Sequence, residues 1–382
     1  MARIDAPVAV IGGGVVGCAV AHALARRGTG ALLLEAEPGL ALGASGANSG
    51  ILHTGFDSPP GELETRLILR ASALREQLMD ELGVSSWRCG ARLRPAAETE
   101  HAAVARLAAN ALRNGVECRL EPDGSLLVPG ETVTDPVAFV HALARAAEAG
   151  GASVRLNAPV VALAPGPDRG LLLTLAGGEH LSARAAVNCA GLFADEVAAL
   201  AGDRPVEIYP RKGEFLVFPS PPQAHLREIL LPVPSELGKG VLVFPTLDGH
   251  VIAGPTARER SDKRDWSVEP DAVEKILAKA RRMCPALAGV EPLGAYAGLR
   301  PAGRAGNYVI EPSRSLPGLI HVAAIRSTGM SASLAIGEHV LGLLAAAGAI
   351  DPAAEERALP APASPGPRAW WERAAEHHAA AR

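Results

Sequence analysis

The stretch that decides the fold is APVAVIGGGVVGCAVAHALARRGTGALLLE, residues 6–35. It begins as a short apolar strand that runs into glycines, and VVGCAVAHALARRG then has the length and the Ala and Leu content of a helix. ALLLE follows as a second apolar strand. This order of strand, turn, helix and strand predicts the opening of a parallel βαβ unit.

Residues 12–17 form a GxGxxG motif between this strand and this helix. Gly12 permits a tight turn, Gly14 lets a pyrophosphate approach the helix N-terminus, and Gly17 lets the helix lie close to the strand. Glu35 ends the next strand, where it can accept hydrogen bonds from a ribose hydroxyl. A glycine-rich turn without a ligand is the alternative, but the context favours a dinucleotide. The predicted residues are Gly12, Gly14, Val15, Val16, Gly17 and Glu35.

Composition bounds the class of protein. The chain has 382 residues, enough for two domains or two lobes, and its 48% of hydrophobic residues argues against global disorder. The net charge of −4 argues against a nucleic-acid binder. The five cysteines include no CxxC pair, so we predict no metal site and no disulfide framework, and expect reduced thiols in a cytoplasmic protein.

Two apolar stretches, residues 7–24 and 330–350, do not have the pattern of a membrane span. The first carries four glycines, and Glu338 and His339 interrupt the second. The N-terminus also lacks the charged and apolar regions of a signal peptide. We therefore expect a protein without a membrane-spanning helix.

Along the chain, helical patterns cover residues 61–84, 98–115 and 135–151, the last with Asp135 as its predicted cap. After Asp203 the pattern changes to strands, with an Asp-Gly turn at 248–249 marking a hairpin. We predict an α/β fold, α+β overall, with a parallel lobe and an inserted, mostly antiparallel sheet. The predicted boundaries are 1–84, 135–205 and 300–350 for the nucleotide-binding lobe, 85–134 and 206–299 for the substrate lobe, and 351–382 for a flexible tail.

GASGANSGILHTGF, residues 43–56, favours FAD over NAD. Such a Gly and Ser segment soon after Glu35 indicates a second close approach of backbone to ligand, toward the reactive ring. The chain has no second GxGxxG for a separate nicotinamide nucleotide. One tightly held dinucleotide that carries its own redox ring is FAD.

GGGVVG with Glu35, GASGANSGILHTG, AAVNCAG, YAGLRP and IRSTGMSAS occur in this order and resemble the D-amino-acid-oxidase-type flavoprotein superfamily. Within it the motifs are most similar to FAD-dependent glycerol-3-phosphate dehydrogenases and L-2-hydroxyglutarate oxidases. The resemblance spans about residues 5 to 348 and implies a Rossmann-like FAD-binding lobe. It places Ala44, Ser45, Asn48, Ser49, Gly50 and Ile51 along the flavin or pyrophosphate, Val160, Ala190 and Gly191 at the adenosine end, and Thr328, Gly329, Met330 and Ser331 under the flavin pyrimidine.

The helix that begins near Gly329 supports this placement physically. A helix N-terminus stabilises the negative charge that a reduced flavin carries at N1 and C2=O. The alternative is a helix start rich in small residues that faces no ligand.

His53 lies beside the proposed flavin-facing segment, and an imidazole suits proton transfer near neutral pH. We predict that it is the base for a substrate hydroxyl or a polar clamp on the substrate oxygen. The alternative is a histidine that only packs on the flavin or caps a loop. His250 and His321 remain further candidates for the base, although an exposed turn or strand position fits each better.

The resemblance implies that Arg300, in YAGLRP, holds the anionic group of the substrate above the flavin. It also implies that Arg300 contacts the FAD. A guanidinium fork binds planar anions at two points; a surface ion pair is the alternative. Arg326 is a second cation of this kind. Tyr296, Tyr209 and Lys212 lie on strands of the inserted lobe, where each either contacts a polar head group or serves packing.

The expected function is an FAD-dependent oxidase or dehydrogenase that takes hydride from the CH–OH carbon of glycerol 3-phosphate or an L-2-hydroxy acid to flavin N5. The alternatives are an amine oxidase of the glycine, sarcosine or proline type, and a flavoprotein subunit of an electron-transfer complex. The acceptor is O2, a quinone or a partner protein, and Trp370 and Trp371 dock the tail on the body, a partner or a membrane surface. The exact substrate, the FAD linkage and the oligomeric state stay open.

Overall fold

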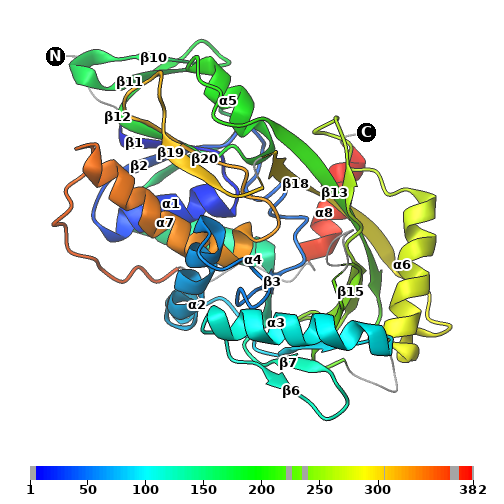
Figure 1. Cartoon of the computed structure of the whole chain (residues 1–382). Helices are drawn as coiled ribbons and strands as arrows, with labels where there is room; N and C mark the ends of the chain where they lie inside the picture. Colours follow the sequence, from blue (N-terminus) through cyan, green and yellow to red (C-terminus); the bar gives the residue numbers. More distant parts are fainter. Residues whose placement is uncertain (1–5, 221–225, 235–239, 305, 362–369, 381–382) are drawn as a thin grey trace.

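The computed structural model describes residues 6–220, 226–234, 240–304, 306–361 and 370–380. Two large sheets lie side by side (Figure 1). Strands from residues 6–34, 153–188 and 309–323 form the first sheet, and strands from residues 91–128 and 208–303 form the second. A small third sheet lies where the two meet. The α/β class predicted from residues 6–35 is confirmed.

The first sheet contains the predicted βαβ unit. In its parallel part, β1 (Ala6–Ile11) pairs with β2 and with β12, β2 pairs with β9, and β12 pairs with β20. The antiparallel pairs of this sheet are β10 with β11, β11 with β12 and β19 with β20. The other strands are β2 (Ala31–Leu34), β9 (Ser153–Arg155), β10 (Val160–Pro165), β11 (Leu171–Leu175), β12 (His180–Asn188), β19 (Val309–Pro312) and β20 (Leu319–Ala323).

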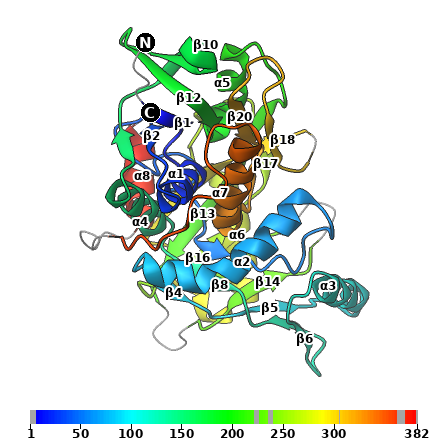
Figure 2. The ribbon, with the colours of Figure 1, turned by 90° about the vertical axis from the view of Figure 1, so that its left-hand side faces the viewer.

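Helices cover one face of this sheet (Figure 2). α1 (Val15–Arg26) packs on α4 (Pro136–Ala149) and α7 (Gly329–Ala346), and α7 packs on α2 (Leu63–Glu81). The side chain of Asp135 accepts hydrogen bonds from the first turn of α4, which confirms the predicted cap. On the opposite face, apolar side chains of β1, β2, β11 and β12 form a second core cluster with Val197 of α5 (Ala194–Leu200).

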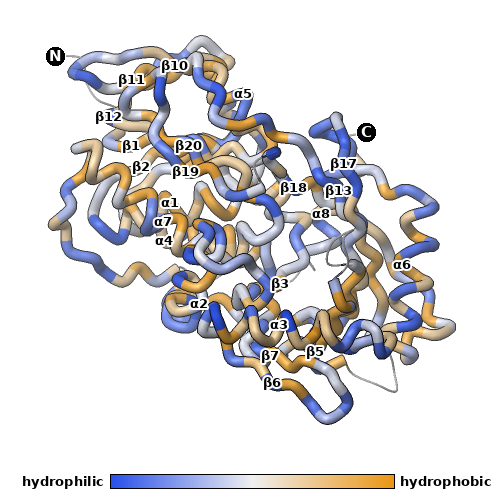
Figure 3. Tube along the Cα trace, in the orientation of Figure 1, coloured by the Kyte–Doolittle hydropathy of each residue, from blue (hydrophilic) through white to orange (hydrophobic). Residues whose placement is uncertain are grey.

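α7 is, among the described helices, the one long and apolar enough to cross a membrane by length and composition. In the fold 61% of its apolar window is buried. A Cβ on Gly337 would lie 2.9 Å from the carbonyl oxygen of Ala19, so the glycine permits close packing of α7 on α1. Figure 3 shows the hydrophobic colour along β1, α1 and α7, where this core lies.

The second sheet is antiparallel except for one pair, β14 with β5. The hairpin predicted around Asp248-Gly249 is present between β15 and β16. α6 (Pro270–Met283) covers one face of the sheet, and α3 (His101–Arg113) lies near β6. The strands are β5 (Ala91–Arg94), β6 (Arg119–Leu120), β7 (Leu126–Val128), β13 (Ile208–Phe218), β14 (Ile229–Pro232), β15 (Leu242–Pro245), β16 (Val251–Gly254), β17 (Arg258–Glu259) and β18 (Gly294–Gly303).

The third sheet orders β3 (Ile51–Leu52), β8 (Thr132–Thr134) and β4 (Ser86–Trp87). Because β3 pairs with β8, it brings the loop around His53 beside Glu131, which is distant in sequence. Four single-turn 3-10 helices complete the described structure, η1 (Glu98–Glu100), η2 (Pro167–Arg169), η3 (Gly191–Phe193) and η4 (Pro285–Leu287).

The described parts of the tail pack on the body, although we expected a flexible segment. The backbone N–H of Arg357 donates to the carbonyl of Arg26, and Leu359 is buried. α8 (Trp370–Ala380) packs on β18 and α4 and buries both tryptophans. Two apolar indole rings supply the contact area for this docking. Residues 362–369 and 381–382 of the predicted tail lie outside the described residues.

Candidate functional site

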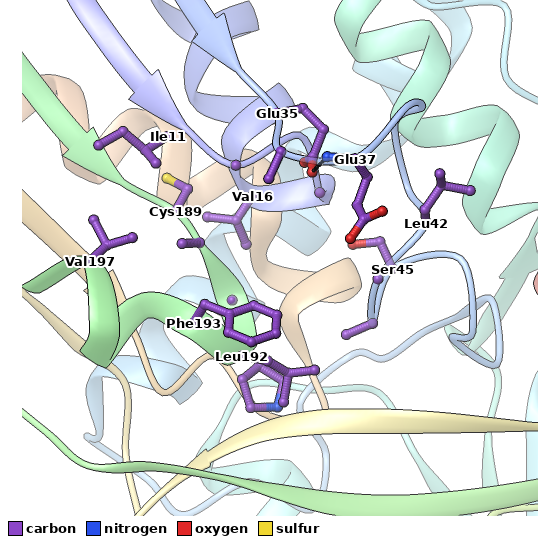
Figure 4. A pocket seen from close by; sticks show the side chains of 18 of the residues that line it. Ile11, Val16, Glu35, Glu37, Leu42, Ser45, Cys189, Leu192, Phe193 and Val197 are labelled. Carbon is purple, nitrogen blue, oxygen red and sulfur yellow. Dashed lines mark hydrogen bonds between the residues drawn. The ribbon is translucent and has the colours of Figure 1, made fainter. Parts of the chain in front are cut away.

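A cavity of about 770 Å³ lies where the β1–α1 turn, the 41–48 loop and the start of α7 meet (Figure 4). Its size suits a large organic ligand. Figure 4 shows Glu35, Glu37 and Ser45 on one side of it and Leu192, Phe193 and Cys189 on the other. The predicted residues that line it are Gly12, Gly14, Val15, Val16, Glu35, Ala44, Ser45, Asn48, Val160, Ala190, Gly191, Arg326, Gly329 and Met330.

The glycines of the GxGxxG motif are required by close backbone contacts. Gly12 has φ +110°, and a Cβ there would lie 2.5 Å from the carbonyl oxygen of Cys189. A Cβ on Gly17 would lie 1.9 Å from the carbonyl oxygen of Gly12, so this glycine serves the packing of α1 and does not line the cavity. Gly14 faces Ser45 at the cavity wall.

The N-terminus of α1 opens on the cavity. Its N-cap is Gly14, which has no side chain to cap the helix, and the N–H of Val15 donates to Ser45 Oγ at 2.9 Å. The positive end of the helix dipole therefore faces the space where a pyrophosphate would lie.

Glu35 lies at the same end of the cavity. Its carboxylate accepts the N–H of Gly13 at 2.5 Å and the N–H of Glu37 at 2.8 Å. Burial raises the pKa of Glu35, although these N–H groups oppose the shift. A carboxylate has about four lone-pair positions, so it keeps acceptor capacity for a ribose hydroxyl.

The start of α7 forms another part of the wall through Gly329 and Met330. Ser331 Oγ accepts the N–H of His53 at 2.8 Å, and Thr328 Oγ1 donates to Glu64 at 2.6 Å. Ser331 and Thr328 therefore hold the wall in place from behind it.

Ser49, Gly50 and Ile51 also lie behind the wall. Gly50 has φ +73°, and a Cβ there would lie 2.3 Å from the carbonyl oxygen of Thr134, so only glycine fits. Its N–H donates to Asn48 Oδ1. The N–H of Ile51, the first residue of β3, donates to Ser49 Oγ at 3.4 Å. These contacts fix the loop that carries Asn48 into the cavity.

Glu64 is a functional candidate that the sequence did not reveal. It is 5% exposed and accepts hydrogen bonds from Arg326 at 2.9 and 3.2 Å and from Thr328. Tyr308 extends this network with a 2.6 Å contact to Thr328. Glu64 thus fixes the guanidinium of Arg326 at the cavity.

His53 is held at three atoms. Its N–H bonds to Ser331, its carbonyl accepts Arg75 Nη2 at 2.8 Å, and its Nδ1 lies 2.8 Å from Glu131 Oε2. The side chain is 15% exposed. Although His53 itself is not in the cavity wall, it is bonded to the α7 turn that is. Glu131 is the second functional candidate that the sequence did not reveal.

Arg300 lies on β18 with its guanidinium over β13. Nε donates to Arg211 O at 3.0 Å, and Nη2 donates to Lys212 O and Thr256 O at 3.1 and 2.8 Å. Among the described residues it has no carboxylate partner. Burial, followed by the charge of Arg211, lowers the pKa of Arg300 to about 10. Arg300 itself does not line the cavity, although its neighbour Pro301 does. A cation without a carboxylate partner next to the wall is suited to an anionic ligand.

Three further predicted substrate residues, Lys212, Tyr209 and Tyr296, do not line the cavity either. Lys212 is fully buried and donates to Asp265 at 2.9 Å and to Ser267 at 2.8 Å. Tyr209 lies under the guanidinium of Arg304 at 4.2 Å. The structure does not bring these two side chains together with His53.

Tyr296 is 2% exposed and stacks on Phe215, with 4.8 Å between ring centroids. Trp370 covers it edge-on at 5.4 Å, and the Tyr296 hydroxyl has no hydrogen-bond partner among the described residues. Trp370 belongs to α8. From this helix His377 lines the cavity, and His378 stacks on Trp266 with 3.9 Å between the ring centroids. α8 therefore closes the cavity next to the second sheet.

His321 and His250, the alternative candidates for the base, lie outside the cavity wall. His321 is fully buried in β20 and contacts Asp203 and Asn188, each at 3.3 Å. His250 faces Asp248 and Trp371. Neither lines the cavity, and neither contacts the start of α7 through a described hydrogen bond.

The residues present fit FAD. Two helix N-termini, glycines that leave the backbone bare and one acidic acceptor are combined in one cavity. These features match the pyrophosphate, the ribose and the electron-rich edge of the flavin. When bound, this group supplies an acceptor for hydride.

Comparisons with known proteins agree with this chemistry. The family described as FAD dependent oxidoreductase matches residues 7–343. A glycerol 3-phosphate dehydrogenase from Caloramator mitchellensis is 30% identical over 353 residues, which cover 88% of this chain and 73% of that protein. An L-2-hydroxyglutarate dehydrogenase from Escherichia coli O17:K52:H18 is 28% identical over 281 residues, 68% of this chain and 66% of the relative.

Among solved structures, the dithionite-reduced L-alpha-glycerophosphate oxidase from Mycoplasma pneumoniae with FAD bound is similar. It superposes with a TM-score of 0.83 at 27% identity, over 88% of this chain and 94% of that one.

Proposed function

The chain belongs to the DAO family of FAD-dependent oxidoreductases, and from this premise we propose that it oxidises the CH–OH group of a small anionic alcohol, with glycerol 3-phosphate as the first candidate. L-2-hydroxyglutarate is the second. The observation that carries the proposal is 30% identity over 88% of the chain to a glycerol 3-phosphate dehydrogenase, together with an FAD-bound glycerophosphate oxidase of the same fold.

The residues at the site support an anionic alcohol. Arg300, next to Pro301 of the cavity wall, has no carboxylate partner among the described residues, and Arg326, held by Glu64, lines the cavity itself. A guanidinium fork binds phosphate or carboxylate in two places. We assign both arginines to the anionic group of the substrate.

His53 supports oxidation of an alcohol over that of an amine. A hydroxyl must lose its proton as the carbon loses hydride, whereas an amine can bind already neutral. We assign the hydroxyl proton to the imidazole of His53, which is held beside the α7 turn by three contacts.

The family requires an electron acceptor as well as a substrate. We propose O2, a quinone or a partner protein as the acceptor, with α8 as the contact for such a partner or a membrane surface. Hydrogen peroxide formed by the purified chain in air would indicate O2. Flavin that is reduced by substrate but reoxidised only by a quinone would indicate a dehydrogenase.

The decisive experiment is anaerobic bleaching of the flavin absorbance with a panel of substrates. We expect bleaching with glycerol 3-phosphate or L-2-hydroxyglutarate, and none with glycine, sarcosine or proline. Bleaching by the amines alone would overturn the proposal in favour of an amine oxidase. Glycerol without its phosphate is the matched control, because it offers the hydroxyl without the anion.

A further inference from the structure

Glu131 precedes β8 and is fully buried. Its Oε2 lies 2.8 Å from Nδ1 of His53, and its Oε1 accepts the N–H of Thr54 at 2.7 Å and the Thr54 hydroxyl at 2.8 Å. One carboxylate therefore binds two consecutive residues of the loop that begins after β3.

We propose that Glu131 is a positioning residue that holds His53 with its proton on Nδ1 and leaves Nε2 unprotonated, as the acceptor of the substrate proton. This inference rests on the proposed function, in which His53 takes that proton. The tautomer itself can be measured independently of any substrate.

The assignment of the tautomer follows from the hydrogen-bond inventory. An ionised carboxylate only accepts hydrogen bonds, so Nδ1 of His53 must donate to it. Burial alone would raise the pKa of Glu131, but His53 and Thr54 more than offset this and lower the pKa. The carboxylate is therefore ionised, and a neutral imidazole carries its proton on Nδ1.

The same pair stabilises the charge that forms during the reaction. In the proposed reaction the hydroxyl proton would pass to Nε2 of His53, and bound FAD would supply the acceptor for the hydride of the carbinol C–H, so that the alcohol would become a carbonyl compound. The resulting imidazolium lies 2.8 Å from a buried anion. The electrostatic attraction is strong in such a site because little water screens it.

Arg75 fixes the loop from the other side. Its guanidinium donates to the carbonyls of Leu52 and His53 at 3.0 and 2.8 Å and is buried. With backbone and ring both held, His53 has one orientation. A simpler role for Glu131, as a cap for the loop through Thr54, would need no particular tautomer of His53, and this difference makes the two roles separable.

Glu131→Gln tests the tautomer directly. The N–H of Thr54 can only donate, so the carboxamide oxygen of glutamine must face Thr54 and the NH2 group must face His53. Nδ1 then becomes the acceptor, and the proton moves to Nε2. Imidazole 15N chemical shifts of the FAD-loaded, oxidised protein report this, with the His53 signals identified by their loss in His53→Ala.

We expect Nδ1–H in the wild type and Nε2–H in Glu131→Gln. We also expect flavin reduction by glycerol 3-phosphate in single turnover to slow by about 10²- to 10⁴-fold with FAD retained, the range for loss of a positioned base. Glu214→Gln is the matched control, because Glu214 is equally buried and also accepts a threonine hydroxyl and a backbone N–H, from Thr256 and Glu269. It should keep both the rate and the tautomer of His53.

Each outcome decides the inference. A wild-type protein with its proton on Nε2 overturns it without any variant, which matters if Glu131→Gln does not fold. A folded Glu131→Gln protein that keeps Nδ1–H or the wild-type rate also overturns it. If no anionic alcohol reduces the flavin, the proposed function fails, but the 15N measurement still decides whether Glu131 sets the tautomer.

Discussion

Ser45 Oγ accepts the backbone N–H of Val15 at 2.9 Å, and this bond joins the 41–48 loop to the first turn of α1. The two glycine-rich segments, 30 residues apart, thereby form one wall of the cavity. A Cβ on Gly14 would lie 3.1 Å from the same hydroxyl. Gly14 thus faces both the loop and the space for the ligand.

Gly14→Ala should separate cofactor binding from folding. The side chain of Ser45 can shift by a few tenths of an ångström, so we expect the free energy of unfolding to change by less than about 1 kcal/mol. The methyl group excludes a pyrophosphate from the helix N-terminus, and FAD affinity should fall at least about tenfold, or 1.4 kcal/mol. Flavin fluorescence during titration of apoprotein measures this.

The control for Gly14→Ala is Gly342→Ala. A Cβ at position 342 of α7 would meet nothing within 4 Å. Alanine there should stabilise the helix slightly and leave FAD affinity unchanged. Equal FAD affinity in both variants would show that no phosphate approaches Gly14.

The sequence predicted the βαβ unit and the glycines at the cavity wall because these depend on local signals. Two apolar runs, β1 and β2, predict buried strands from their composition alone. Between them, the spacing of Gly12, Gly14 and Gly17 predicts a turn where no side chain fits. The helix start at Gly329 was predicted in the same way.

Glu64 and Glu131 could not be predicted, because their partners are distant in sequence. Glu131 meets His53 across 78 positions, and Glu64 meets Arg326 across 262. Glu64 lies in the first turn of an amphipathic helix, where a carboxylate usually faces water. Lys212 was equally hard to place, because β13 is buried along most of both faces and alternation gives no clue.

His53→Ala should slow flavin reduction by about 10²- to 10⁴-fold in stopped-flow single turnover, because the hydroxyl proton loses its acceptor. FAD should stay bound, since the glycine wall does not depend on this side chain. His180→Ala is the control, because His180 is exposed at the start of β12. Unchanged reduction in His53→Ala would remove this residue from the mechanism.

Arg300→Lys should raise the substrate concentration needed for half-maximal flavin reduction. Lysine keeps the charge but loses the planar fork of donors. Loss of one partner from a buried charge pair weakens binding by about 2–5 kcal/mol, so the concentration should rise roughly 30-fold or more. The limiting rate should change less than this concentration. If the rate falls and the concentration does not change, Arg300 serves folding through its three carbonyl bonds.

Asp265→Asn should destabilise the fold in a pH-dependent way. Burial would raise the pKa of Asp265, but Ser267 and the ammonium of Lys212 lower it to about 2. A carboxylate with a lowered pKa stabilises the fold above its ordinary pKa, and the contribution is lost as the pH falls from about 4 to 2.

At neutral pH this contribution is about 2 kcal/mol, so urea unfolding of Asp265→Asn should show that loss. The difference from wild type should shrink as the pH approaches 2. Asp80→Asn, exposed on α2, is the control and should show no comparable change. A deficit that is constant across this pH range would contradict the assigned ion pair.

A chain ending at residue 361 lacks α8 and should release FAD faster. His377 lines the cavity, Trp370 covers Tyr296, and His378 stacks on Trp266, so this helix closes the cavity beside the second sheet. Loss of closing contacts worth about 1.4 kcal/mol would speed release about tenfold. Flavin fluorescence after dilution measures the rate, and Glu372→Ala, which changes an exposed position of α8, should leave it unchanged. Equal rates for the shortened and full chains would show that α8 packs on the body without closing the cavity.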